Sequence, residues 1–183
     1  MRALWRLFKT CLYGLVTVMV VTWGGSLVLR QVAEPVVEIT PELIERVKGM
    51  FPIMYAEKGI GLAAPQIGWN VRLFVVNVSG EPGDELVVIN PEIVEKNGGT
   101  WTMEEGCLSL PGINGKVKRE KRVVFHGSDL EGEGFELEAE GLVGRCLLHE
   151  YDHLTGVLFI DRVSPIQKLT IKKKLKKLKG KNK

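Results

Sequence analysis

The chain has 183 residues, of which 45% are hydrophobic, with 25 lysines and arginines against 22 acids. This length and apolar content suit a single domain with its own core. The three cysteines, Cys11, Cys107 and Cys146, are too few for a disulfide framework and indicate a reducing compartment. The charge is uneven, because the first 163 residues carry a net charge of −6, whereas the last twenty carry nine lysines and no acid.

The N-terminal stretch has two interpretations. Residues 1–10 hold three basic residues and no acid, and residues 10–29 carry no charge, which is typical of a signal peptide or a short membrane anchor. Residues 16–22 (VTVMVVT), however, are rich in β-branched side chains, which favours a strand. We predict the strand and treat residues 1–16 as an extension, either a short anchor or the result of a start codon assigned too early.

A helix is expected after Thr40, since threonine caps helix N-termini and Pro41 suits the first helical position. Pro52 should kink or shorten this helix, because proline lacks a backbone donor and clashes with the preceding turn. The next segment, residues 59–68 (GIGLAAPQIG), has three glycines, which let a ligand or another backbone approach closely. A tight turn of no further function is the alternative.

Four segments have the composition of strands, namely residues 72–78, 85–90, 123–125 and 135–138. The last two are separated by the turn-rich sequence GSDLEGEG. A sheet-forming first part followed by a buried helix predicts an α+β fold rather than a doubly wound one.

The buried helix is predicted from residues 141–159 (GLVGRCLLHEYDHLTGVLF), which contain an HExxH pattern. On a helix, His149 and His153 lie on one face and can bind the same metal ion. Glu150 then lies beside the metal, where a carboxylate can take a proton from a bound water. Apolar residues on the other faces, including Val143, predict a helix buried on most sides, and Gly156 offers its C-terminal stop.

An HExxH pattern alone is weak evidence, because it occurs by chance in about 1% of chains of this length. A third ligand is available in residues 104–112 (EEGCLSLPG), where Cys107 lies beside glycine. Two imidazoles and a thiolate would leave one metal position open for water, as in a catalytic site. A lone cysteine is more often a small buried residue, so the ligand role of Cys107 is predicted only because the motifs occur together.

Together, GIGLAAPQIG, EGCLSLPG and HEYDHLTGVLF resemble the three signature motifs of the peptide deformylases. The similarity extends from about Thr17 to the C-terminus. The resemblance implies removal of the formyl group from the N-terminal formylmethionine of new polypeptides. It also implies one catalytic domain over residues 17–183, in which antiparallel or mixed sheets surround the HExxH helix and residues 164–183 form a basic C-terminal helix.

The resemblance also implies a metal site made by Cys107, His149 and His153. One divalent ion is expected there, most simply Fe²⁺, with Zn²⁺, Ni²⁺ and Co²⁺ as alternatives. Glu150 would act as general base and then as general acid. The Gln66 side chain and the Leu108 backbone N–H would hold the developing oxyanion.

A methionine pocket follows from the same resemblance. Its expected lining is Ile60, Leu142, Arg145 and Cys146. The backbones of Gly61 and of residues 106–108, beginning at Gly106, are expected to pair with the substrate chain. Arg145 is expected to contribute its aliphatic stem and to keep its charge toward water. Glu105 and Arg119 could form a supporting ion pair, with a solvated Arg119 as the alternative.

Two other classes of function stay open at this stage. A zinc peptidase that cuts internal bonds would need a third ligand beyond His153, where Asp161 is the only acid. An inactive binding relative would be expected to have lost Glu150 or Gln66, and both are present.

The expected partners are nascent formylmethionyl polypeptides, and we expect a monomer in the cytoplasm unless the N-terminal stretch directs the chain to a membrane or an organelle. The C-terminal residues 164–183 predict a basic helix whose apolar positions, Ile166, Leu169, Ile171, Leu175 and Leu178, could partly dock on the domain. Its lysines, including Lys172, Lys173, Lys176 and Lys177, would then point outward. Ribosomal RNA is the expected partner of this charge, and anionic lipid or no partner are the alternatives.

Overall fold

The computed structural model describes residues 21–22 and 26–181, and it describes side chains of the last helix only as far as Leu175. The strand expected at residues 16–22 and the boundary expected at residue 16 therefore lie almost wholly outside the described residues. The described α-helices are α1 (Pro41–Lys48), α2 (Met50–Ala56), α3 (Gly141–Leu154), α4 (Phe159–Arg162) and α5 (Pro165–Lys181). The 3₁₀ helices are η2 (Leu27–Arg30) and η3 (Ala64–Ile67). The strands are β1 (Gly61–Ala63), β2 (Leu73–Val76), β3 (Leu86–Gly106), β4 (Asn114–Ser128) and β5 (Gly134–Glu140).

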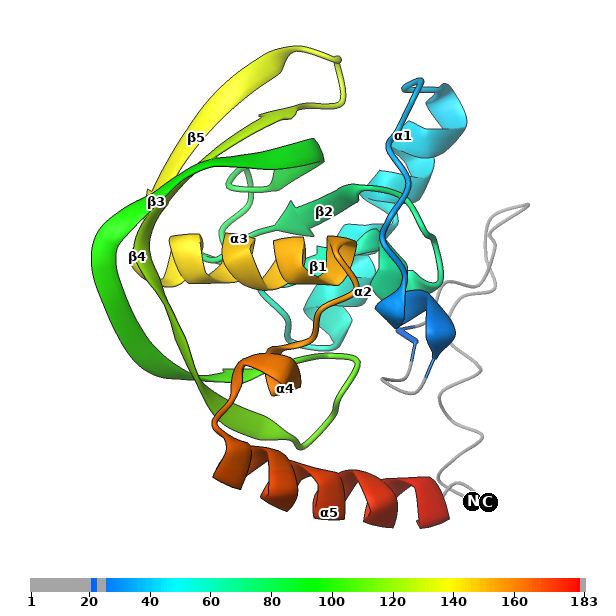
Figure 1. Ribbon diagram of the computed structural model, residues 1–183. Coiled ribbons are helices and arrows are strands. Elements are labelled where there is room, and N and C mark those ends of the chain that lie inside the picture. The colour runs from blue at the N-terminus through cyan, green and yellow to red at the C-terminus, as the bar shows by residue number, and fades with distance from the viewer. Residues whose placement is uncertain (1–20, 23–25, 182–183) are drawn as a thin grey trace.

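One antiparallel sheet organises the described chain, with its five strands in the order β1-β2-β3-β4-β5. Figure 1 shows this sheet curving around α3, while α1 and α2 lie on the far side of β1 and β2. The core between α3 and the sheet contains Phe74, Phe125, Leu147 and Leu154, all fully buried. The predicted α+β fold with a central buried helix is confirmed.

The strands β3 and β4 are much longer than the sequence predicted, with 21 and 15 residues. β3 begins in the predicted segment 85–90 but continues to Gly106, so it delivers the chain directly to Cys107. Its register against β4 shifts three times, once at Asn97–Thr100, where Gly98 has a φ of +72°. Such bulges bend a strand and interrupt its side-chain alternation, which is why the pattern was not recognisable in the sequence.

The predicted cap and break of the first helix are both confirmed. The Leu43 N–H donates to Thr40 Oγ1 at 3.2 Å, and Pro41 occupies the first turn. The helix ends at Lys48 and α2 begins at Met50, with Pro52 in its first turn. Because Pro52 has no N–H to donate to the carbonyl four residues earlier, the two helices do not merge.

The helix α3 runs from Gly141 to Leu154 and ends just before Gly156, as predicted. Gly156 has a φ of +71°, and a Cβ there would lie 2.7 Å from the Arg30 carbonyl oxygen, so only glycine fits. The helix is buried along most of its length, but Val143 is partly exposed, because the first turn projects beyond the sheet.

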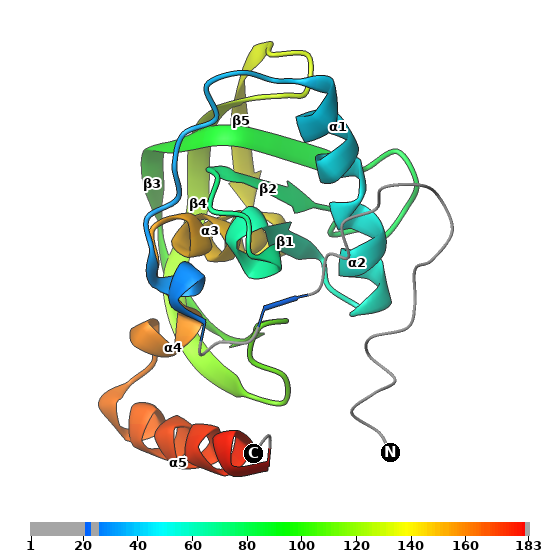
Figure 2. The same cartoon turned by 90° about the vertical axis from the view of Figure 1, so that its right-hand side faces the viewer.

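The C-terminal helix α5 lies below the rest of the molecule in Figures 1 and 2. Ile171, 4% exposed, and Leu175 pack against α4 and the loop that joins β3 to β4. The predicted docking of part of the stripe is confirmed at Ile171, whereas Ile166 and Leu169 are 79% and 65% exposed, because only one narrow stripe of α5 faces the body. Lys172 and Lys173 point outward as predicted, whereas the side chains beyond residue 175 lie outside the described part. None of the described helices is both long and apolar enough to cross a bilayer.

Candidate active site and metal centre

Two segments that are distant in sequence, α3 and the end of β3, meet at one cluster of side chains. The helix contributes His149 and His153, one turn apart, and the end of β3 presents Cys107 to them. The Cys107 Sγ lies 3.3 Å from His153 Nε2, and one ligand atom from each of the three residues falls within 4.8 Å of the others. This is the spacing expected of atoms that share one metal ion with bonds of about 2.0–2.3 Å.

The hydrogen bond of His149 and the neutral state of His153 both suit a metal ion. His149 Nδ1 lies 3.0 Å from Glu105 Oε2, and this hydrogen bond leaves Nε2 as the ligand atom. His153 is buried, and burial, followed by the nearby charges of His149 and Arg119, lowers its pKa well below the usual value. A neutral imidazole is the form that binds metals. Two imidazoles and a thiolate suit iron, zinc, nickel and cobalt alike.

Glu150 is buried next to these groups. Burial raises its pKa to about 7, although the charges of His149 and Arg119 act against the rise. Its Oε2 is buried and has no hydrogen-bond partner in the described part of the chain. The backbone of Gly61 comes so close that a Cβ there would lie 2.6 Å from Glu150 Oε1. A carboxyl group with a pKa near neutrality can both accept and return a proton.

Gln66, in η3, is held in one orientation. Its Oε1 accepts the Ala63 N–H at 2.7 Å, so its amide nitrogen must point the other way. That nitrogen lies 3.5 Å from Cys107 Sγ and from Ser109 Oγ. The side chain therefore presents a fixed N–H donor beside the ligand cluster.

A pocket of about 430 Å³ opens next to the cluster. Of the twelve site residues predicted from the sequence, eleven line it, and His153 does not. Those eleven are Ile60, Gly61, Gln66, Gly106, Cys107, Leu108, Leu142, Arg145, Cys146, His149 and Glu150. The sequence missed Met103 and the residues at the mouth of the pocket, among them Glu57 and Lys58. Met103 belongs to the part of β3 that was not recognised as a strand.

The expectation for Arg145 was wrong in one respect. Its side chain is 3% exposed, and its charge does not point toward water. The guanidinium donates to Glu105 Oε1 at 2.6 Å and to the carbonyls of Val117 and Trp101 at 3.1 and 3.0 Å. A buried carboxylate and two carbonyls replace water around the charge, and these interactions offset the free-energy cost of burying it.

The suggested pair of Glu105 and Arg119 is present, and the alternative of a solvated Arg119 is wrong. Arg119 Nε and Nη2 donate to the two carboxylate oxygens of Glu105 at 2.6 and 2.8 Å. Burial alone would raise the pKa of Glu105, but the hydrogen bonds from Arg119 and His149 and their charges hold it far below its usual value. Arg119 Nη1 also donates to Asp152 Oδ2 at 2.9 Å. Asp152 was missed, because nothing in HEYDH marks its aspartate as buried.

The comparisons with known proteins agree with this geometry. The family model of polypeptide deformylase matches residues 18–169. The chain belongs to the polypeptide deformylase family. It is 49% identical over 154 residues to the peptide deformylase of Chromobacterium violaceum, a match that covers 84% of this chain and 92% of that protein.

Solved deformylase structures show the same fold. A peptide deformylase from Legionella pneumophila superposes with a TM-score of 0.85 at 38% identity, covering 91% of this chain and 98% of that one. One from Synechococcus elongatus in complex with actinonin gives a TM-score of 0.82 at 40% identity, covering 89% of each. The chain is therefore a hydrolase that removes the N-formyl group from nascent polypeptides, and its family is metal-dependent.

Proposed function

We propose that the deformylation is carried out by Glu150, Gln66 and the Leu108 N–H around a metal held by Cys107, His149 and His153. The observation that supports this most directly is the clustering of the three ligand atoms within 4.8 Å beside a buried carboxylate. A divalent metal bound there would supply a Lewis acid and a nucleophilic water at neutral pH. Purified protein should release formate from formyl-Met-Ala and leave acetyl-Met-Ala intact; equal inertness toward both would contradict the proposal.

Glu150 is the group that moves the proton. Glu150 Oε2, which has no hydrogen-bond partner among the described residues, accepts a proton from the water that attacks the formyl carbon. The same oxygen then gives this proton to the departing amine. The pKa near 7 supports both halves of this cycle. Gly61, by having no side chain, leaves room for the carboxylate beside the substrate.

The developing oxyanion receives two hydrogen bonds from the protein. Gln66 Nε2 is one donor, and it needs no reorientation because Ala63 already fixes the amide. The Leu108 N–H is the other, and among the described residues it has no backbone acceptor of its own. Donors fixed before the reaction stabilise charge without a reorganisation cost.

The pocket orients the methionine. Ile60, Leu142 and Cys146 supply an apolar wall, which suits an unbranched thioether. Gly61 and Gly106 offer backbone groups from β1 and β3 for the substrate chain. Arg145 contributes only its stem, since its charge is already satisfied by Glu105.

We infer that the native ion is Fe²⁺, with zinc, nickel and cobalt as substitutes. The partly exposed thiol of Cys107 supports a specific test, because a redox-active ion beside a thiolate makes both open to oxidation. Iron-loaded protein should lose activity in air far faster than nickel- or zinc-loaded protein. Equal half-lives in air would contradict the assignment.

The catalytic domain is proposed to begin near Thr17, in agreement with the family match from residue 18. A chain that lacks residues 1–15 should stay soluble and active. An inactive truncation, or full-length protein that sediments with membranes, would support the membrane anchor instead and would contradict a cytoplasmic location.

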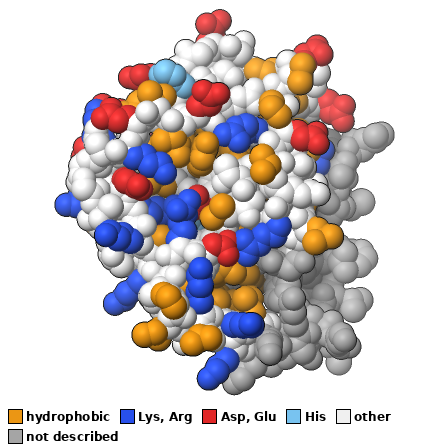
Figure 3. Space-filling model, viewed as in Figure 1, with side chains coloured by type: hydrophobic (Ala, Val, Ile, Leu, Met, Phe, Trp, Pro, Cys, Tyr) orange, Lys and Arg blue, Asp and Glu red, His pale blue; other side chains and the backbone are white. Residues whose placement is uncertain are grey.

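The basic helix α5 is proposed to dock on ribosomal RNA, with the enzyme acting as a monomer. Its exposed lysines, among them Lys172, Lys173 and Lys174, support contacts to phosphate groups, and Figure 3 shows basic side chains at this end of the molecule. Such binding weakens steeply with salt. Deleting residues 168–183 should abolish cosedimentation with ribosomes while sparing activity on a short formyl peptide; unchanged cosedimentation would contradict it.

A further inference from the structure

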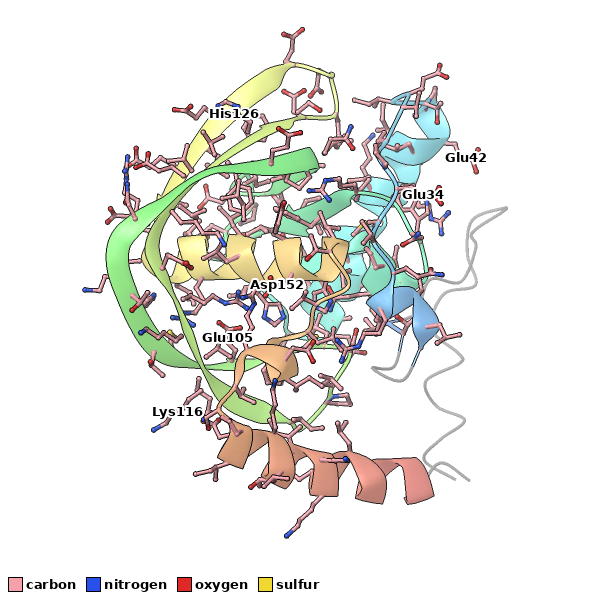
Figure 4. The ribbon with its side chains drawn as sticks, viewed as in Figure 1. Glu34, Glu42, Glu105, Lys116, His126 and Asp152 are labelled. Carbon is pink, nitrogen blue, oxygen red and sulfur yellow. The ribbon has the colours of Figure 1, made fainter. Side chains whose placement is uncertain are left out.

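A chain of ion pairs runs from the surface to the metal site. Four residues make it, in the order Arg162, Asp152, Arg119 and Glu105. We call this the ion-pair chain, and Figure 4 shows Glu105 and Asp152 near each other between α3 and α4. It ends on His149, whose Nδ1 lies 3.0 Å from Glu105 Oε2.

Arg162 is the only member of the ion-pair chain with substantial exposure. Its side chain is 39% exposed, whereas those of the other three are 3–5% exposed. Arg162 donates two hydrogen bonds to Asp152, from Nε to Oδ2 and from Nη2 to Oδ1. Among the described residues it is the sole partner of Asp152 Oδ1, so its loss would leave a buried carboxylate oxygen without a donor.

Arg119 cannot compensate for that loss without changing the metal site. Its Nε and Nη2 are both occupied by Glu105, and only Nη1 reaches Asp152. If Arg119 rotated to donate to both oxygens of Asp152, it would lose one or both of its hydrogen bonds to Glu105. Glu105 would then be free to shift against His149, since the guanidinium fork fixes the carboxylate in its plane.

The helix α4 contacts His149 in a second way. The Phe159 ring stacks on the His149 imidazole, with ring centroids 6.2 Å apart and an interplanar angle of 24°. Phe159 and Arg162 are the first and last residues of this short helix. Two residues of α4 therefore act on His149, Phe159 by direct contact and Arg162 through the ion-pair chain.

We propose that Arg162 is a positioning residue for the proposed metal ligand His149, which it holds in place through the ion-pair chain. The proposal rests on the function proposed above only in taking His149 to be a ligand. Groups that orient a metal ligand directly are worth about 10–100-fold in metal affinity. Arg162 acts through intervening groups, so a smaller effect is expected.

The test measures metal loss and metal geometry in full-length protein. Nickel-loaded Arg162→Gln should lose its ion to a chelator about three- to tenfold faster than the unaltered protein. The visible absorption of the cobalt-loaded form should also shift, because the bands report ligand geometry. Arg162→Lys, which keeps the charge but not the fork, should restore part of both.

The matched control is Arg30→Gln. Arg30 is a guanidinium of similar exposure, 42%, and it pairs with Asp161, the neighbour of Arg162 on α4. It is outside the ion-pair chain, so its loss should leave metal release and the cobalt spectrum unchanged. If Arg162→Gln behaved like this control, with only a lower Tm, Arg162 would merely tie α4 to α3 and the proposal would be wrong.

A double substitution decides whether the effect travels through the ion-pair chain. In a Glu105→Gln background, Arg162→Gln should change metal release by less than about twofold, because the link to His149 is already cut. If Arg162→Gln accelerated metal release as strongly in this background as in the unaltered protein, the effect would not pass through Glu105 and the proposal would be wrong. Should Glu105→Gln not fold, Asp152→Asn serves as the background. If His149→Ala bound nickel as tightly as the unaltered protein, the proposed function would fail instead, which distinguishes the two failures.

Discussion

The helices α3 and α5 have similar lengths, 14 and 17 residues, but opposite relations to the rest of the molecule. α3 is enclosed by the sheet and α4, and the charges of Glu150 and Asp152 are buried. α5 touches the body mainly through Ile171 and Leu175 and presents lysines to solvent. Burial gives a charged group a shifted pKa and a fixed geometry, whereas exposure gives it only long-range attraction. Chemistry therefore belongs to α3, and α5 is suited to docking.

The largest effect is expected at Glu150, the proposed proton-transfer group of α3. Glu150→Gln keeps the size of the side chain and leaves the three ligands in place, so the metal should stay bound. Turnover of formyl-Met-Ala should fall by about 10²–10⁴-fold, the usual contribution of acid–base catalysis. Metal analysis of the purified variant is the control, and a near-normal rate in a fully loaded sample would exclude Glu150 as the acid–base.

A loss of about 10²–10³-fold in kcat is expected from Gln66→Glu. The new carboxylate can still accept the Ala63 N–H, so η3 keeps its hydrogen bond. It no longer offers an N–H to the oxyanion. KM should change much less than kcat, and a variant that lost affinity alone would show that Gln66 acts in substrate binding.

Within α5, the buried stripe should matter for stability and not for chemistry. Ile171→Ala should lower the free energy of unfolding by about 2–3 kcal/mol, since it empties a packed site. Thermal unfolding gives the measurement, and kcat at 25 °C should be unchanged. A parallel loss of activity would mean that α5 supports the metal site and would weaken the contrast between the two helices.

The smallest effect is expected on the outer face of α5. Leu169→Ala removes a similar amount of apolar side chain, but from a position that is 65% exposed. Its effect on the free energy of unfolding should be within about 0.5 kcal/mol. It is thus the matched control for Ile171→Ala, and a large destabilisation would show that this face is covered in solution.

The acidic and the basic ends of the molecule also differ. Figure 3 shows acidic side chains at the end that carries the turn between β4 and β5, and basic side chains at the end that carries α5. The sequence predicted the basic end from the +9 charge of its last twenty residues, but it did not predict where the acids gather. Which apolar residues of α5 would dock could not be predicted, because Ile166 and Leu169 have the same character as Ile171.

The sequence by itself determined the features that depend on local geometry. The four-residue spacing of His149 and His153 places both on one helix face, and the caps at Thr40 and Gly156 follow from backbone preferences. The α+β class was predictable from the order of the strand-like segments and the buried helix. The pairing of the HExxH pattern with Cys107 was predictable because the motifs occur together and resemble those of the peptide deformylases.

Only the tertiary structure decided what surrounds these motifs. Arg145 looks like an exposed arginine in the sequence, yet Glu105 reaches it from 40 positions away and makes its burial possible. Asp152 and Arg162 could be connected to His149 only after β3, β4 and α4 had been placed around α3. The energy of a buried charge depends on partners that meet in space, and local sequence carries no record of which distant groups will meet.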